Sequence, residues 1–247
     1  MRWIKTLRST GVRSCSLGAL VAASAAISAG AQTPSTTPPP AVSRPAPASQ
    51  PPRFLVVLDA AHGGDDFGGR LADEPEKSFA LALSVRLRSL LAARGIQVVT
   101  TRESDVTMDA AHRAEIANRA KAQACLSLHA SETGFGIHLF ASSLPPVPAS
   151  RIPAWQTAQA AWVTQSLALA GVLNSALLHA GLPVTLGRTA LPEVDSMTCP
   201  AIAVEVAPNK AADASSATDL DVPAYQARVA EALAAALLEW KTEVQQP

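Results

Sequence analysis

The stretch VVLDAAHGGDDFGGR, residues 56 to 70, joins an apolar run to a glycine-rich loop and carries one histidine and three aspartates. A short apolar run that ends in an acid is typical of a buried strand. Glycine-rich loops after strands often bind phosphate. This one has neither the G-x-x-x-x-G-K-[ST] nor the G-x-G-x-x-G spacing, and its aspartates would repel an anion. The stretch therefore predicts a strand end that presents His62, and not a phosphate loop.

Outward from this stretch, strand-like and helix-like segments alternate along the chain. Strands interleaved with helices of ordinary length are typical of a layered α/β domain with a mostly parallel sheet. We therefore expect a single three-layer α/β domain, in which a mostly parallel twisted sheet carries helices on both faces. Further strands are predicted at 96–102, 124–130, 134–142 and 200–207, and helices at 74–95, 109–123, 155–180 and 222–240.

The first fifty residues have a different composition from the rest of the chain. A basic start, a short apolar stretch and the small residues Ala29-Gly30-Ala31 predict a secretory signal peptide over residues 1–31. Residues 32–53 are rich in proline, which fixes φ and predicts an extended spacer. The catalytic domain is therefore expected at 54–247, in an exported protein of the periplasm or cell wall.

Charge and cysteine content narrow the function further. The 247 residues include 20 basic and 20 acidic side chains, so the formal net charge is zero. This argues against a nucleic-acid partner bound by phosphate neutralisation. No second apolar segment is long enough to span a membrane. After removal of the signal peptide only Cys125 and Cys199 remain, and they are either a disulfide or two buried thiols.

Three of the predicted strands deliver ionisable side chains to their carboxyl ends. These are His62 after the first strand, His129 in SLHA and Glu205 in AVEV. Active sites of α/β domains form outside the carboxyl ends of parallel strands. Two histidines and a carboxylate are a zinc ligand set, and a second carboxylate can serve as the base. The chain offers two carboxylates for these two roles, Glu205 and Glu76 at the start of the first helix. Glu74 could replace Glu76 as the ligand.

The other histidines are expected to have no part in this site. A single histidine is more often a structural or surface residue than a ligand. His112 lies on a polar helix face, and His179 lies near a helix end, where a cation suits the helix dipole. His138 is assigned with them to the structural or surface class.

Four sequence blocks, in order, resemble the zinc-dependent N-acetylmuramoyl-L-alanine amidases that trim bacterial peptidoglycan. VVLDAAHGGDDFGG (56–69) is similar to the D-x-G-H-G-G-x-D-x-G block of that family. PEKSFALALSVRLRSLLAARGIQVVTTRESD (75–105) resembles its E-K-x-x-x-L helix followed by T-R-x-x-D. HRAEIANRAKAQACLSLHA (112–130) resembles R-x-x-x-A-N followed by S-I-H-A, and CPAIAVEVAPN (199–209) resembles P-A-x-L-V-E-V-G-F-x-x-N.

The resemblance implies an activity and a role for each site residue. It places Zn²⁺ on His62, Glu76 and His129, which selects Glu76 over Glu74, and it makes Glu205 the catalytic glutamate. The implied reaction is hydrolysis of the amide between N-acetylmuramic acid and L-alanine of the stem peptide, with peptidoglycan as the substrate. Asp59 is expected to orient the His62 imidazole from outside the metal ligands.

Some positions depart from the family pattern. Ala61 replaces a glycine, and it would be strained if that position needs a positive φ. HASE lacks an asparagine, and EVAPN is shorter than the family's block. The segment 141–195 is too short for the blocking helix of some relatives, so none is expected. The alternatives are a catalytically impaired peptidoglycan-binding protein of the same fold, or a zinc hydrolase of another peptide or amide.

Overall fold

The computed structural model describes residues 53–71, 74–148, 151–210, 217–218, 220 and 222–246. The predicted signal peptide and nearly all of the proline-rich spacer lie outside these residues. The described chain is built on a six-stranded sheet in the order β4-β1-β5-β8-β6-β7. The strands are β1 (Leu55–Ala60), β4 (Gln97–Thr100), β5 (Ala124–Ala130), β6 (Ile137–Ser142), β7 (Val184–Thr189) and β8 (Ala201–Val206).

The strand directions decide which residues share an edge of this sheet. The strands β4, β1, β5 and β8 are parallel, whereas β6 runs antiparallel to β8 and carries β7 parallel to itself. The expected mostly parallel sheet is therefore confirmed. Because β6 is reversed, its amino end lies at the same edge as the carboxyl ends of β1, β5 and β8.

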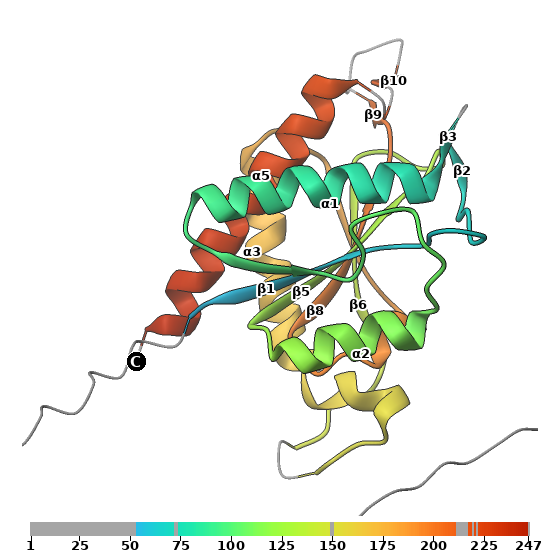
Figure 1. Cartoon of the computed structure of the whole chain (residues 1–247). Helices are drawn as coiled ribbons and strands as arrows, with labels where there is room; N and C mark the ends of the chain where they lie inside the picture. The colour runs from blue at the N-terminus through green and yellow to red at the C-terminus, as the bar shows by residue number, and fades with distance from the viewer. Residues whose placement is uncertain are drawn as a thin grey trace, which may run out of the picture. The chain divides into compact units, whose positions relative to one another are not determined.

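Helices cover both faces of the sheet, as expected (Figure 1). The helices α1 (Glu76–Ala93), α3 (Val163–His179) and α5 (Pro223–Gln245) pack over the larger core, while α2 (Ala110–Ala120) and α4 (Pro192–Asp195) pack over the smaller one. Alternating strand residues divide between the two cores: Val56 and Leu58 enter the larger, and Val57 enters the smaller. This alternation follows from the two-residue period of a strand.

The α1 helix forms where the apolar period predicts it. Phe79, Leu83, Leu87 and Leu91 recur every four residues and are all buried against the sheet. This spacing places the four side chains on one stripe of a helix with 3.6 residues per turn. The stripe fixes α1 on the sheet and so fixes where its first turn lies.

The predicted helix at 155–180 is wrong in one respect, because it is broken near its start. The structure has a 3₁₀ helix, η1 (Trp155–Ala161), bent by 66° from α3. The side-chain amide of buried Gln159 donates to the carbonyls of Met197 and Cys199, which ties η1 to the segment before β8. Neither β7 nor α4 was expected. The shorter elements are β2 (Arg70–Leu71), β3 (Glu74–Pro75), β9 (Asn209–Lys210) and β10 (Ala217–Thr218).

None of the described helices is by itself long and apolar enough to cross a membrane, and only the bent pair of η1 and α3 passes that test jointly.

Cys125 and Cys199 form a disulfide in the smaller core. Cys125 lies in β5, and Cys199 lies two residues before the start of β8. Because β5 and β8 are neighbours, Cys125 pairs in register with Ala201, close to Cys199. Of the two states left open by the sequence, the structure has the disulfide.

Candidate metal centre

His62, Glu76 and His129 come together at the carboxyl edge of the sheet, as predicted. Each offers a ligand atom, and these atoms all lie within 4.8 Å of one another. His62 Nε2 is 3.1 Å from Glu76 Oε2, and His129 Nδ1 is 2.8 Å from Glu76 Oε1. Glu74, the alternative ligand, is exposed in β3 and takes no part in this group.

The loop after β1 brings His62 to this position at a cost in backbone conformation. His62 has a φ of 61°, in the left-handed region, whereas Ala61 is not among the described residues with positive φ. The strain expected at Ala61 therefore falls on the next residue. A non-glycine residue in this region costs roughly 1–2 kcal/mol. Gly68 is needed beside it, because a Cβ there would lie 2.5 Å from His62 Cδ2 and 2.7 Å from Glu76 Oε2.

Two buried cations hold the strained loop. Arg102 Nη2 donates to the carbonyl oxygens of Ala61 and Lys77, at 2.9 and 2.7 Å. Lys77 Nζ in turn donates to the carbonyl of Gly64 at 2.6 Å and to Asp105 Oδ2 at 2.7 Å. The E-K and T-R-x-x-D blocks of the sequence thus meet at the loop. They fix the backbone on which His62 depends.

A carboxylate orients the His62 imidazole, but it is not the predicted one. Asp66 Oδ2 lies 2.9 Å from His62 Nδ1. The prediction that Asp59 has this role is wrong. Asp59 is fully buried, where it accepts hydrogen bonds from Thr101 Oγ1 and Ser127 Oγ, each at 2.8 Å. Asp59 lies within β1 and faces its neighbouring strand, whereas Asp66 is on the same loop as His62.

His129 has a second carboxylate beside it that the sequence did not reveal. Glu193 Oε1 of α4 lies 3.5 Å from His129 Nε2, and Ser127 Oγ lies 3.3 Å from the same nitrogen. A carboxylate only accepts hydrogen bonds, so this arrangement favours a hydrogen on Nε2. His129 Nδ1 is then the nitrogen available to a metal, as Nε2 is in His62. The only sequence signal was an acid in a connector predicted to be irregular.

The charges of the metal-free centre favour a bound cation. Burial raises the pKa of Glu76, but hydrogen bonds from His129, His62 and the Gly69 amide outweigh it and hold that pKa well below its usual value. Burial lowers the pKa of His129, but Glu193 and Glu76 outweigh it and raise the pKa to about 9. The hydrogen bond to Glu76 raises the pKa of His62, against the effect of burial. Both histidines of the centre therefore hold a proton more tightly than a free imidazole does.

The three donors fit a metal ion. Two imidazole nitrogens and one carboxylate oxygen, with a position left for water, are the ligand set of catalytic zinc sites. Each histidine has a carboxylate on its other nitrogen, the usual arrangement around metal-bound imidazoles.

Glu205 lies beside this group, on the neighbouring strand. It pairs in register with His129 of β5 on one side and with His138 of β6 on the other. Its carboxylate oxygen Oε1 is 2.7 Å from His138 Nδ1. His138, expected to be a structural or surface residue, is not among the grouped ligands, but it contacts the predicted catalytic residue. His112 and His179 are exposed, as expected.

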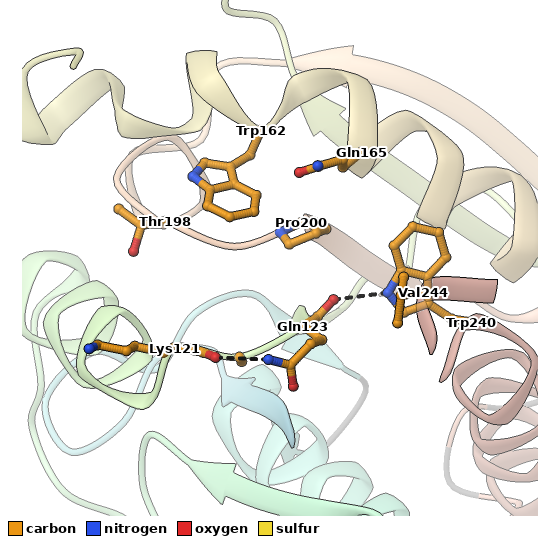
Figure 2. Close-up of a pocket in the computed structure, with 9 residues that line it drawn as sticks. Lys121, Gln123, Trp162, Gln165, Thr198, Pro200, Trp240 and Val244 are labelled. Carbon is orange, nitrogen blue, oxygen red and sulfur yellow. Dashed lines mark hydrogen bonds between the residues drawn. The ribbon is translucent and has the colours of Figure 1, made fainter. Parts of the chain in front are cut away.

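A separate pocket of about 480 Å³ lies at the opposite edge of the sheet. Gln123 and Pro200 line it directly before β5 and β8, between the side chains of Trp162 and Trp240 (Figure 2). Trp240 Nε1 donates to the Gln123 carbonyl at 2.9 Å. None of the predicted site residues reaches this pocket.

Comparisons with known proteins agree with this arrangement. A family profile described as N-acetylmuramoyl-L-alanine amidase matches residues 56–239. An endolysin of Bacillus phage SPP1 is 40% identical over 83 residues, which cover 33% of this chain and 31% of that protein. The N-acetylmuramoyl-L-alanine amidase AmiA of Escherichia coli is 40% identical over 78 residues, covering 31% of this chain and 27% of AmiA. The matches thus cover less than a third of each curated relative.

Solved structures share the fold. Ami1 of Mycobacterium smegmatis, an N-acetylmuramyl-L-alanine amidase, superposes with a TM-score of 0.61 at 21% identity, covering 77% of this chain and 97% of that one. The catalytic domain of CwlV from Bacillus (Paenibacillus) polymyxa var. colistinus gives a TM-score of 0.59 at 23% identity, covering 76% and 98%. With the profile match over most of the folded domain, these findings show that the chain belongs to the N-acetylmuramoyl-L-alanine amidase family.

Proposed function

We propose that this protein is a zinc-dependent hydrolase that cuts the amide bond between N-acetylmuramic acid and the L-alanine of the peptidoglycan stem peptide. The observation that carries the proposal is the convergence of His62, Glu76 and His129 at one sheet edge, with Glu205 one strand away. Membership of the amidase family supports the choice of reaction and substrate.

His62 Nε2, Glu76 and His129 Nδ1 would hold the zinc ion. Zinc in such a site supplies a Lewis acid and lowers the pKa of water from 15.7 to about 7. The residues of the chain then have separate roles. Glu76 lies between the two histidines and is the anionic ligand. Asp66 and Glu193 keep the hydrogens on the histidine nitrogens that do not face the ion.

Glu205 is the proposed general base. Its side chain is 31% exposed, so that substrate and water can reach it, and no other strand of the sheet lies between it and His129. Its carboxylate would take the proton of the attacking water and pass it to the leaving amine of L-alanine. General acid–base catalysis of this kind contributes typically 10²- to 10⁴-fold to the rate.

The proposed export of the protein fits this substrate, since peptidoglycan lies outside the cytoplasmic membrane. The signal peptide proposed for residues 1–31 would take the enzyme there.

Replacement of Glu205 by glutamine tests the proposed role. Glu205→Gln is expected to bind zinc as well as the wild type and to release stem peptides from peptidoglycan at least 100-fold more slowly. Glu239→Gln is the matched control, because Glu239 is exposed on α5 and is not part of the site. A Glu205→Gln enzyme with normal turnover would remove the base from the proposal.

A further inference from the structure

His138 lies in a row with the metal centre. It is the register partner of Glu205, and Glu205 is the register partner of His129. Residues paired in register project from the same face of a sheet. Two residues from Glu205 and His138, Ala203 belongs to the smaller core and Phe140 packs against it, which places the row on that face. Glu205 is therefore flanked by a proposed metal ligand on one side and by His138 on the other.

The contact between His138 and Glu205 is short and specific. Nδ1 of His138 lies 2.7 Å from Oε1 of Glu205, and the two side chains are 16% and 31% exposed. An ionised carboxylate only accepts hydrogen bonds, so Nδ1 of His138 donates, and a neutral imidazole then has no hydrogen on Nε2. Among the hydrogen bonds between described residues, only this one reaches the Glu205 side chain. Oε1 is thereby occupied, whereas Oε2 is available.

Neighbouring residues restrict the position of the His138 imidazole. Gly134 has a φ of +80°, and a Cβ there would lie 2.6 Å from Cε1 and 3.0 Å from Nε2 of His138. The ring of Phe140 also packs against the imidazole edge to face, with centroids 6.2 Å apart. The loop before β6 thus leaves room for the ring only because residue 134 is glycine.

We propose that His138 is a positioning residue that holds the carboxylate of Glu205 for catalysis. The inference rests on the proposed role of Glu205 as the base. A glutamate has three rotatable side-chain bonds, and one hydrogen bond to Oε1 restricts the carboxylate about them. Because β5 and β6 lie on opposite sides of β8, His138 binds Oε1 from the side away from His129, and no hydrogen bond between described residues uses Oε2. A misplacement of about 1 Å in a catalytic group can cost roughly 10²-fold in rate.

Two substitutions at position 138 separate the hydrogen bond from the bulk of the side chain. In His138→Asn the amide Nδ2 is attached to Cγ, as Nδ1 is in histidine, so it can donate to Oε1. His138→Leu has similar size and no donor. We expect His138→Leu to lower kcat about 10- to 100-fold with little change in KM or zinc content, and His138→Asn to recover most of that loss. His179→Leu, at the exposed end of α3, is the control and should match the wild type.

A substitution in the loop before β6 tests the same contact without changing His138 or Glu205. Gly134→Ala places a methyl group against the imidazole and is expected to lower kcat as His138→Leu does, without further effect when the two are combined. Wild-type kcat in His138→Leu would overturn the proposal. Equal losses in His138→Asn and His138→Leu would also overturn it, since the donor would then be irrelevant.

The contact can also be measured without turnover. In ¹⁵N-histidine-labelled protein, the signals absent from His138→Asn belong to His138, and they should show a hydrogen on Nδ1 that is lost from this nitrogen in Glu205→Leu. A hydrogen on Nε2 alone in the wild type would overturn the proposal. Glu205→Gln, assayed in parallel, distinguishes the two failures. If it is fully active, the proposed base role of Glu205 has failed; if it is inactive while His138→Leu is normal, only the positioning role has failed.

Discussion

Glu193 Oε1 lies 3.5 Å from Nε2 of His129, on the edge of the imidazole away from the proposed metal-binding nitrogen Nδ1. The contact joins α4, the helix before β8, to the metal centre at the end of β5. Since both side chains are mostly buried, water screens the pair little. Glu193 therefore selects the nitrogen through which His129 can bind a metal.

Loss of the Glu193 charge should weaken metal binding. In Glu193→Gln we expect zinc affinity to fall about 10- to 100-fold, as is typical when a partner of a ligating histidine is changed. Competition with a chromophoric chelator measures this affinity. Glu115→Gln is the control, because Glu115 is exposed on α2 and pairs with Arg119 of the same helix. Unchanged affinity in Glu193→Gln would show that the 3.5 Å contact does not affect the metal.

Each of the three proposed ligands should be required for binding. His62→Ala, Glu76→Ala and His129→Ala are each expected to reduce bound zinc to less than a tenth of the wild-type content, measured by elemental analysis after dialysis. A third ligand is needed to complete a catalytic zinc site. His112→Ala, a histidine exposed on α2, should retain full zinc. Full occupancy in any of the three ligand variants would exclude that residue from the site.

The stability of the metal-free protein should fall as the pH rises from about 6.5 to 9. Because the folded-state pKa of His129 is raised from 6.5 to about 9, the folded protein binds a proton in this range that the unfolded chain does not. The contribution of this proton to the free energy of unfolding is complete below pH 6.5 and is lost as the pH approaches 9. The slope is up to about 1.4 kcal/mol per pH unit. His62, whose pKa is also raised, acts in the same direction.

Urea unfolding between pH 6.5 and 8.5, with and without a chelator, measures this effect. If His129 binds zinc as proposed, it would be neutral in the zinc-loaded protein, and the decline should disappear. Zinc affinity should rise over the same range, because binding displaces the protons. A metal-free protein whose stability is flat over this range would contradict the raised pKa.

The disulfide should contribute to stability rather than to chemistry. Cys125 and Cys199 close a loop with a sequence separation of 74 residues. The double replacement by serine is expected to lower the free energy of unfolding by about 2–5 kcal/mol. It should leave zinc affinity of the folded protein unchanged, because the sulfur atoms lie in the smaller core and not among the ligands. Thermal melting and zinc titration of the same variant measure both expectations.

The sequence predicted the part of the site that depends on strand ends. His62 follows one apolar run typical of a buried strand and His129 lies at the end of another, and parallel strands bring their carboxyl ends to one edge. Glu76 was selected over Glu74 by the family resemblance, and its position in the first turn of α1 explains the geometry. The sequence left the state of Cys125 and Cys199 open, and the pairing of β5 with β8 brings the two cysteines together.

The site contacts that the sequence did not reveal depend on strand direction and on the conformation of connecting segments. His138 is the second residue of β6, so it reaches the site only because this strand is antiparallel to β8. Nothing in the local pattern of β6 fixes its direction. Glu193 lies in α4, a single turn that begins at a proline in a segment expected to be irregular. Asp66, and not Asp59, contacts the His62 imidazole because the loop turns back on His62. This turn depends on the left-handed backbone conformation of His62.

Digestion of peptidoglycan by the purified protein identifies the bond that is cut. The purified protein is incubated with peptidoglycan, with zinc or with a chelator, and the soluble products are identified by mass spectrometry. The proposed cleavage would give stem peptides that begin with a free L-alanine amino group, released with zinc, absent with chelator and released at least 100-fold more slowly by Glu205→Gln. Binding to peptidoglycan without release under any metal condition would contradict it and favour a binding protein. Products cut at another amide would favour a hydrolase of different specificity.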